Sequence, residues 1–461
     1  MKQLERVRRY KKNLVKCPLF SEVVGNETMS ESSAENVINY VFAPALNGFV
    51  AWVLAESMKQ GIRRLYFLAR DGYFLYQTAR VYVDLYDLPI ECRYFYCSRY
   101  SIRRPNYHMD LEKALDYITL GGLDVTMDKI YRRAGLDGKQ RERMQEEAIV
   151  PFQIDEQIPR QRLENVKKVL RNSKLFTEIL EENSRKVFPA FEQYLTEEGL
   201  LEKLPMALVD SGWVGSMQKE LNLSLQRLGK RNSLKGFYWG LYEVPAGVKR
   251  EDYRTYFFDP EGGLRRKVGF NNCLFESIVT APHGMTIGYE KKEGKTEPQL
   301  AAISPDRRER LWTMEKLLAK WMGVFLQKVD PKPGISLLEE LGGQEVRRII
   351  ESNMELFMHH PTEQEAIAFG GLEFTDDILE YEGNQIAAKL NERELLQNHL
   401  WGRILGALSG RKRHVKQSAW YEGSAVLYGK HPKYHIFQYS CYKYAMNYRK
   451  RSIWRKNYGS N

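Results

Sequence analysis

Two short turns combine charged residues with glycine in a pattern that suits the binding of a phosphorylated ligand. The first is Arg70-Asp71-Gly72, and the second extends from Asp210 to Ser216. An arginine can hold a phosphate through two parallel hydrogen bonds, and glycine lets a ligand approach the backbone closely. Each turn alone is a weak signal, because a structural ion pair or a capped strand–helix turn can contain the same residues.

The residue types in these turns indicate what each can do. In the first turn, Arg70 can bind phosphate, Gly72 permits close approach of a ligand, and Asp71 supplies a carboxylate. In the second turn, Asp210 can bind a magnesium ion or accept a hydrogen bond from a sugar hydroxyl. We expect substrate contacts from the rest of that turn, namely Ser211, Gly212, Trp213, Gly215 and Ser216.

The segments around both turns have the order of a parallel α/β sheet. Residues 65–69 form a continuous apolar run, which is typical of a strand covered on both faces. Residues 73–84 then show helical spacing, and 91–97 predict a second strand. Residues 205–210 predict another buried strand, followed by a helix over 217–228. Because ligands of such sheets bind at the carboxyl ends of the strands, both turns occupy a favourable place.

The remaining sequence divides into regions of different character. We expect a basic N-terminal segment (1–35), an α/β catalytic core (36–105 and 201–295), a helical insertion (106–200) and a helical C-terminal region (300–461) with a basic, aromatic tail. Further expected elements are a buried helix over 34–58 kinked at Pro44, strands at 236–241 and 253–258, and helices at 304–328, 344–358, 362–369 and 391–408.

Charge is distributed unevenly along the chain, which carries a net charge of +11 over 461 residues. Residues 1–16 hold seven Lys or Arg and one acid, and residues 442–461 hold six and none. The rest contains 57 basic and 58 acidic residues, which argues against nucleic-acid binding, since that would concentrate basic charge around a groove. The basic ends predict either attraction to an anionic membrane surface or to a partner, or two solvated tails.

Cysteine usage and hydropathy indicate an intracellular protein. The five cysteines are scattered without a CxxC pair, so the sequence supports neither a disulfide framework nor a zinc site. The basic N-terminus lacks the apolar segment of a secretory signal. No uninterrupted apolar run reaches the about 18 residues of a membrane span. We therefore expect a cytoplasmic location, with the inner face of the plasma membrane as an extension of it.

Three separated motifs give the chain a resemblance to a known family. They are residues 65–75 (LYFLARDGYFL), 94–99 (YFYCSR) and 207–218 (ALVDSGWVGSMQ), and residues 275–276 (FE) and 281–284 (APHG) add to them. Together they resemble the glycan phosphoribosyltransferases, the ribofuranosyltransferase module of bacterial polysaccharide loci that often accompanies haloacid-dehalogenase-type phosphatases. The resemblance covers roughly residues 36–290, because the motifs occur in order along that stretch.

The resemblance implies a fold and a reaction. The fold is a Rossmann-like or phosphoribosyltransferase-like parallel sheet. The donor is phosphoribosyl diphosphate with Mg²⁺, and the acceptor is a lipid-linked glycan of capsule or O-antigen synthesis. A phosphatase then removes the 5-phosphate. That enzyme must be a separate protein, because Thr375-Asp376-Asp377 does not match the DxDx(T/V) motif of such phosphatases.

The resemblance also implies roles for individual residues. Asp71 is our first choice for the base that activates the acceptor hydroxyl, and Asp210 is the second. Related enzymes carry two adjacent acids in the later turn, whereas Asp210 here precedes a serine. The expected substrate-binding residues outside the second turn are Arg70, Gly72, Ser98, Arg99, Arg103, Glu276 and His283.

Two alternatives from other functional classes stay open. One is a phosphatase of the haloacid-dehalogenase type, and the other is a non-catalytic scaffold that binds a sugar phosphate. Release of pyrophosphate from phosphoribosyl diphosphate would distinguish the transferase from both.

Overall fold

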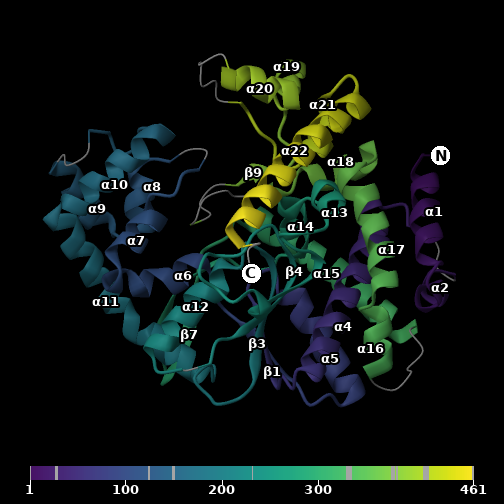
Figure 1. The fold of residues 1–461 in the computed structure, drawn as a ribbon, viewed down its shortest axis with the longest axis horizontal. Helices are drawn as coiled ribbons and strands as arrows, with labels where there is room; N and C mark the ends of the chain where they lie inside the picture. Colours follow the sequence, from purple (N-terminus) through teal and green to yellow (C-terminus); the bar gives the residue numbers. More distant parts are fainter. Residues whose placement is uncertain are drawn as a thin grey trace.

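A five-stranded parallel sheet forms the centre of the chain in the computed structural model (Figure 1). The strand order is β2-β1-β3-β4-β5, and every neighbouring pair runs parallel. The strands are β1 (Arg64–Leu68), β2 (Glu91–Phe95), β3 (Met206–Trp213), β4 (Lys235–Leu241) and β5 (Tyr253–Phe258). The structure describes residues 2–25, 30–122, 125–147, 151–230, 232–328, 335–374, 379, 383–408 and 415–458.

The chain reverses its direction of travel across the sheet between β1 and β3. It passes from β1 to the edge strand β2, and then returns to place β3 on the other side of β1. Leu65 pairs with Cys92 on one side and with Ala207 on the other. All of β1 is buried, as the continuous apolar sequence from Leu65 onward predicts, and Arg64 at its start is buried too. A crevice at the carboxyl ends of the strands is expected at this reversal, so the topology favours a ligand site beside β1 and β3.

Helices cover the sheet, and the predicted α/β class is confirmed. The predicted helix over 34–58 consists of α3 (Ser33–Val37), a π-helical segment (Ile38–Phe42) and α4 (Ala43–Lys59), with Pro44 directly after the π-helical turn. The combined helix is long and apolar enough to cross a membrane, but 94% of its most apolar window is buried inside the protein. Two helices that follow strands are α5 (Tyr73–Tyr86) and α12 (Ser216–Arg227), close to the predicted bounds.

The region between β2 and β3 is largely helical and forms a lobe to one side of the sheet (Figure 1). It has its own cluster of buried apolar residues, which includes Leu115, Ile130 and Phe176. Its elements are α6 (Arg99–Arg103), a 3₁₀ helix (Arg104–Met109), α7 (Leu111–Ile118), α8 (Met127–Arg133), α9 (Gly138–Glu146), a second 3₁₀ helix (Arg160–Arg162), α10 (Leu163–Asn172) and α11 (Lys174–Glu197).

A β-hairpin joins this lobe to the core, and the sequence pattern did not predict it. The hairpin consists of β6 (Thr286–Lys292) and β7 (Lys295–Leu300), and both strands pack against α11. Tyr289 of β6 stacks on Tyr194 of α11 with 4.3 Å between ring centroids. A 3₁₀ helix (Arg250–Asp252) directly precedes β5, and α13 (Leu264–Gly269) and α14 (Asn272–Val279) lie between β5 and the hairpin.

The C-terminal region is mainly helical, as predicted, and the helices predicted over 304–328, 344–358 and 362–369 are found within one residue of those bounds, the second of them with a π-helical last turn. The helix predicted over 391–408 is broken at Asn398, whose side-chain amide donates to the carbonyls of Glu394 and Lys416. The elements are α15 (Pro305–Lys328), α16 (Ile335–Leu341), α17 (Gln344–Met354), a π-helical segment (Glu355–His359), α18 (Glu363–Gly370), the short strands β8 (Glu373–Phe374) and β9 (Asn384–Gln385), α19 (Glu392–Gln397), α20 (Leu400–Leu408), α21 (Tyr421–Tyr428) and α22 (Pro432–Tyr458).

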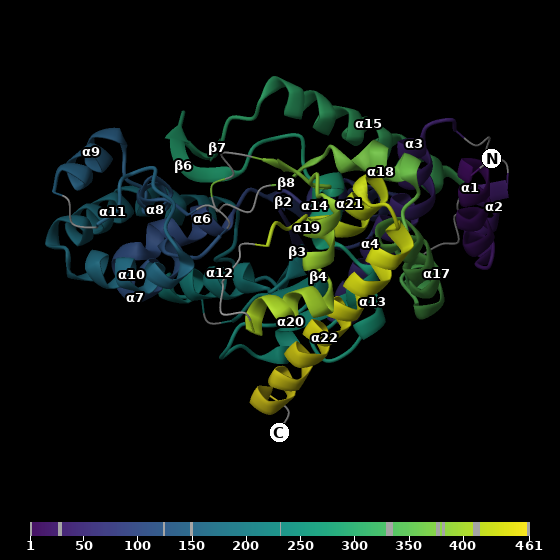
Figure 2. The ribbon, with the colours of Figure 1, turned by 90° about the horizontal axis from the view of Figure 1, so that it is seen from above.

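The basic N-terminal segment forms two helices, α1 (Lys2–Leu14) and α2 (Pro18–Gly25). Val7, Tyr10 and Leu14 recur at helical spacing and are buried, so α1 has an apolar face that packs against α17. The two ends of the chain lie far apart in both views (Figures 1 and 2). The basic ends therefore do not form a single surface.

Candidate active site

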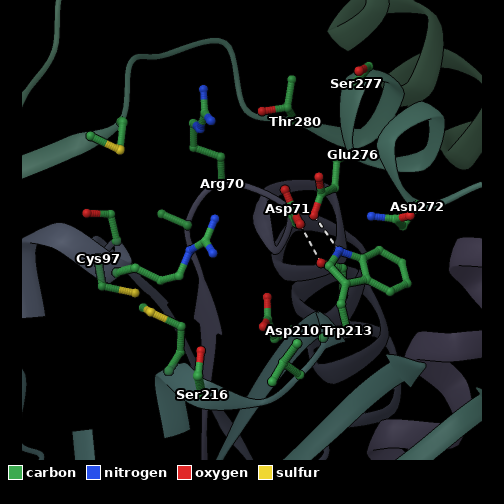
Figure 3. A pocket seen from close by; sticks show the side chains of 18 of the residues that line it. Arg70, Asp71, Cys97, Asp210, Trp213, Ser216, Asn272, Glu276, Ser277 and Thr280 are labelled. Atoms are coloured by element: carbon green, nitrogen blue, oxygen red, sulfur yellow. Dashed lines mark hydrogen bonds between the residues drawn. The ribbon is translucent and has the colours of Figure 1, made fainter. Parts of the chain in front are cut away.

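A cavity of about 390 Å³ opens at the carboxyl ends of β1, β2 and β3 (Figure 3). Both predicted turns contribute to its wall, as do α14 and the region after β2. Among the residues predicted for the site, the wall contains Arg70, Asp71, Ser98, Arg99, Asp210, Ser211, Gly212, Trp213, Gly215, Ser216 and Glu276. The structure thus brings the two turns into one cavity beside the topological reversal of the sheet.

The two turns contact each other through their side chains. Ser211 donates a hydrogen bond from its hydroxyl to a carboxylate oxygen of Asp71. The pairing of β1 with β3 positions this contact, because Phe67 lies opposite Val209 and both chains leave the sheet a few residues later. Ser211 is buried, so Asp71 is held at a defined place at the mouth of β1.

Gly72 serves the protein's own backbone and does not line the cavity. A β-carbon added at this position would lie 2.5 Å from the carbonyl oxygen of Leu68, which already accepts a hydrogen bond from the Gly72 amide at 2.8 Å. Only glycine lets the chain turn this tightly from β1 into α5. We expected Gly72 to let a ligand approach the backbone. Instead, it allows the tight turn that directs Arg70 and Asp71 toward the cavity.

The second turn begins later than its sequence suggests, because β3 continues through Trp213. Gly212 (φ +109°) and Gly215 (φ +68°) adopt left-handed backbone conformations that favour glycine. Trp213 has φ +70°, which is unusual and strained for a bulky residue. Such strain is maintained where surrounding contacts over-determine it, and here it turns the indole toward α14.

Trp213 and Glu276 form the second polar contact of the site. The indole Nε1 of Trp213 donates to a carboxylate oxygen of Glu276 on α14. The indole ring also packs among Phe258, Phe270 and Phe275, with 5.4 Å between its centroid and that of Phe270. This aromatic packing fixes the indole, so the Glu276 carboxylate is fixed in turn.

Three carboxylates share the cavity, and Figure 3 shows Asp71, Asp210 and Glu276 around the same space. Burial, together with the neighbouring Asp71, raises the pKa of Asp210 to about 8, against the lowering effect of backbone amides and Arg99. Burial likewise raises the pKa of Glu276 to about 8, with Asp71 as the next cause. Like charges at close range disfavour ionisation of both groups. Displaced pKa values of this kind are concentrated at functional sites.

Cationic side chains and a helix N-terminus complete the cavity. Arg70, Arg99 and Arg307 line it. Gly215 and Ser216 open α12 at the wall, and among the described residues no side chain caps that helix. Free backbone amides and the helix dipole favour an anion at such a place. The cavity therefore offers basic groups for phosphate beside carboxylates for a hydroxyl or a cation.

Ser98 and Arg103 have structural partners. The hydroxyl of Ser98 accepts from the amide of Ser101 and donates to the carbonyl of Thr286 at 2.6 Å, so it joins α6 to β6. Arg103 lies outside the cavity, paired with Glu220 at 3.3 Å and stacked on Tyr117 at 4.4 Å from the ring centroid. Arg103 lines a neighbouring cavity of about 350 Å³ between the helical lobe and α12.

His283 also lies outside the cavity wall. Its Nδ1 lies 2.9 Å from the carbonyl of Gly284, and its Nε2 lies 2.8 Å from the hydroxyl of Tyr94. A carbonyl can only accept, so Nδ1 carries the proton and Nε2 accepts from Tyr94. Burial lowers the pKa of His283, and Arg70 lowers it further against the raising effect of the Gly284 carbonyl. This neutral histidine braces β2 beside Arg70.

Some residues of the wall were not predicted. Asn272 and Thr280 lie four residues before and after Glu276, at the first residue and the C-cap of α14, so the 272/276/280 spacing was an available signal. Arg307 on α15 and Glu373 on β8 come from the C-terminal region, and no sequence pattern indicated their approach. Arg310 forms an ion pair with Glu373, which holds this part of the rim together.

The carboxylates of the cavity suit a magnesium ion that is also bound by the phosphates of a substrate. Among the described residues, no group of three His, Cys, Asp or Glu is arranged to hold a metal ion. A cage made only of protein ligands is therefore not formed there. Mg²⁺ is commonly bound by one or two carboxylates together with substrate phosphates. Asp210, with Asp71 beside it, suits that shared mode. The 375–377 segment that fails the phosphatase motif lies outside the described residues.

No family model matches the chain, and no curated protein matches it.

Proposed function

We propose that this chain transfers 5-phosphoribose from phosphoribosyl diphosphate to a hydroxyl of a glycan in capsule or O-antigen synthesis, and releases pyrophosphate. One observation carries the proposal: a single cavity joins arginines and an uncapped helix N-terminus to three carboxylates. A doubly phosphorylated pentose needs both sets, because its phosphates require positive groups and its hydroxyls require acceptors. The motif resemblance to glycan phosphoribosyltransferases supports the same reaction.

The reaction is a substitution at the anomeric carbon of the ribose. The bond from that carbon to the diphosphate oxygen breaks, and a bond to the acceptor oxygen forms. The acceptor proton passes to a carboxylate, for which Asp71 is the first candidate because Ser211 holds it at the cavity. Asp210 is the second candidate.

Positive groups stabilise the departing diphosphate. Arg70 and Arg99 lie in the wall where negative charge develops on the leaving group. The amides at the start of α12 provide a second place for phosphate. Magnesium, when bound through Asp210 and the donor phosphates, adds charge neutralisation. A separate phosphatase then removes the 5-phosphate from the glycan.

The test is incubation with phosphoribosyl diphosphate, Mg²⁺ and a synthetic glycan, with pyrophosphate release and glycan mass as readouts. The Asp71→Asn variant should lose on the order of 10²–10⁴-fold in turnover, because a general base contributes about that much. Donor binding, measured by calorimetry, should survive. Asp84→Asn is the matched control, since Asp84 is exposed on α5, the helix that follows the Asp71 turn.

Three results would contradict the proposal or its assignments. Donor binding without any pyrophosphate release would favour a scaffold. Release of inorganic phosphate from a phosphorylated glycan would favour a phosphatase. Undiminished turnover in Asp71→Asn would remove Asp71 as the base and direct attention to Asp210.

A further inference from the structure

A second cavity, of about 350 Å³, lies between the helical lobe and α12. Its volume is within the range of about 300–1,000 Å³ that is usual for small-molecule sites. The wall is formed by α6, the 3₁₀ helix that follows it, α7 and α12. These four elements place charged, polar and aromatic side chains around one space.

The two cavities follow one another along the same pair of helices. The helix α6 packs against α12 where the helical lobe meets the sheet (Figures 1 and 2). On α6, Arg99 lines the first cavity, and Arg103, four residues later, lines the second. On α12, Ser216 lines the first cavity, and Glu220 and Leu223 on the same helix face line the second. One helical turn advances about 5.4 Å, so the second cavity is the neighbouring space for a substrate that must reach a donor in the first.

The charges of the second cavity are balanced. Its wall contains three basic and three acidic side chains, and each acid has a basic partner. The pairs are Arg103–Glu220 at 3.3 Å, Lys113–Asp110 at 2.7 Å and Lys167–Asp116. A phosphorylated or acidic ligand would have to compete with these acids for the basic groups, and its own charge would be repelled by them. The second cavity therefore favours an uncharged ligand.

The other side chains of the wall suit a ligand that carries several hydroxyl groups. The side-chain amide of Asn106 donates to Ser224 at 3.0 Å, and its oxygen accepts from Arg227 at 2.9 Å. Tyr107 and Tyr117 add aromatic surface to the wall. A sugar ring has hydroxyls at its edge and apolar C–H groups on its faces, so it needs hydrogen-bonding groups beside aromatic rings. An uncharged saccharide meets both requirements.

The hydroxyl of Tyr117 lacks a hydrogen-bond partner. Tyr117 is only 3% exposed, and no described residue bonds its hydroxyl. Burial raises the pKa of this hydroxyl, and Arg99 and Arg103 oppose the rise, so one arginine from each cavity lies near it. A buried hydroxyl without a partner costs stability, and ligands or water usually satisfy such groups. A sugar hydroxyl in the second cavity would supply the missing partner.

We propose that the second cavity binds an uncharged sugar unit of the glycan acceptor, beside the donor in the first cavity. That this sugar belongs to the acceptor rests on the proposed transferase reaction, whereas the saccharide site itself rests on the wall of the second cavity. A lipid chain fits less well, because it would bury the polar groups of the wall without giving them partners.

A glycan array tests the proposal without donor or magnesium. The fluorescently labelled full chain is applied to immobilised bacterial oligosaccharides, of which some are neutral and others contain uronic acids or phosphate. The chain should bind neutral members and not their acidic counterparts. Leu223→Trp should lower binding by about tenfold or more, because the indole takes the space of the sugar. Tyr117→Phe should lower it about two- to tenfold, since it removes one hydrogen bond.

A matched variant separates the second cavity from general effects of an added indole. Gln226 is exposed on α12 outside the wall of the second cavity, so Gln226→Trp should bind the array like the unaltered protein. Calorimetry should show unchanged binding of phosphoribosyl diphosphate in Leu223→Trp, because Leu223 does not line the first cavity. Circular dichroism checks that each variant is folded.

Three outcomes would overturn the proposal. They are failure to bind any neutral oligosaccharide, preference for the acidic members, and unchanged binding in Leu223→Trp. The array and the pyrophosphate assay fail separately. Pyrophosphate release with unchanged array binding in Leu223→Trp would reject the second-cavity site and keep the transferase. Neutral-glycan binding that Leu223→Trp abolishes, without pyrophosphate release, would support the saccharide site and reject the transferase.

Discussion

Carboxylates in two buried clusters of this chain have pKa values that are shifted in opposite directions. In the cavity, burial and a neighbouring carboxylate raise the pKa of Asp210 and of Glu276 to about 8. In the C-terminal region, burial would also raise the pKa of Glu422, but Lys443 and His359 lower it to about 2. The Lys443 ammonium lies 2.8 Å from the Glu422 carboxylate, and His359 lies 3.3 Å from it.

These opposite pKa shifts distinguish Glu422, which stabilises the fold, from Asp210 and Glu276, which are available to a ligand. Glu422 is 1% exposed and its charge is compensated inside the protein. The cavity carboxylates lie close enough to repel one another when ionised, which lowers the stability of the protein. A bound ligand or cation could compensate their negative charge. The variants below change one side of this contrast at a time.

The largest effect is expected from removing the partner of Glu422. Lys443→Met leaves a buried carboxylate without its ammonium, which should lower the free energy of unfolding by about 3–5 kcal/mol. Urea denaturation followed by tryptophan fluorescence measures this. Lys433→Met, at an exposed position of the same helix, should change stability by less than about 0.5 kcal/mol. A loss below about 1 kcal/mol for Lys443→Met would mean that Glu422 takes up a proton or water instead.

Lowering the pH should remove the stability that Glu422 contributes. Its folded pKa is lowered from 4.5 to about 2, so the stability it contributes is complete above about pH 4.5 and is lost as the pH falls toward 2. The total is about 3 kcal/mol. The difference in unfolding free energy between the unaltered protein and Glu422→Gln should narrow by about 1.4 kcal/mol per pH unit below pH 4.5. A constant difference would contradict the lowered pKa.

The cavity should show the opposite pH dependence. The folded pKa of Glu276 is raised from 4.5 to about 8, so its contribution to stability is complete below about pH 4.5 and is lost as the pH rises toward 8. Glu276→Gln keeps an acceptor for Trp213 and removes this loss. The free energy of unfolding of the variant should match that of the unaltered protein near pH 4.5 and exceed it increasingly as the pH rises toward 8, in the same denaturation assay. If Glu276→Gln were less stable than the unaltered protein at pH 8, the negative charge of Glu276 would have to be compensated within the fold.

The smallest effect concerns magnesium. If the cavity carboxylates await a cation, Mg²⁺ at about ten times its dissociation constant should stabilise the protein by about 1 kcal/mol through mass action. Thermal unfolding with and without millimolar MgCl₂ measures the shift. Asp210→Asn should lose most of it, whereas the exposed-site variant Asp84→Asn should keep it. An equal shift in all three proteins would place the magnesium effect elsewhere.

The sheet was predictable because its signals are local. The run at 65–69 is apolar without interruption, and strands covered on both faces need that pattern. The two glycine-containing turns follow such strands directly, so the parallel order alone predicted that they would meet. The hairpin β6–β7 was missed because its sequence is polar along one face and its register depends on packing against α11.

The site was only partly predictable because some of its geometry is tertiary. Gly72 resembled a ligand-approach glycine, yet its missing side chain accommodates the Leu68 carbonyl. Arg103 resembled a phosphate ligand, and its pairing with Glu220 depends on helices that are distant in sequence. Arg307 and Glu373 reach the rim through packing of the C-terminal region, which no local pattern encodes.

The docking of α1 has a consequence for biosynthesis. Tyr10 donates to Glu365 at 2.5 Å, and Asn13 donates to Asn353 at 2.9 Å, although 355 and 340 positions separate these pairs. At about 5–20 residues per second of translation, the first helix waits roughly 20 to 70 seconds on the ribosome for its partners. The π-helical segment Ile38–Phe42 can cover part of its apolar face early, but the part that packs against α17 stays uncovered throughout that interval, which makes nascent chains of this protein natural clients for chaperones.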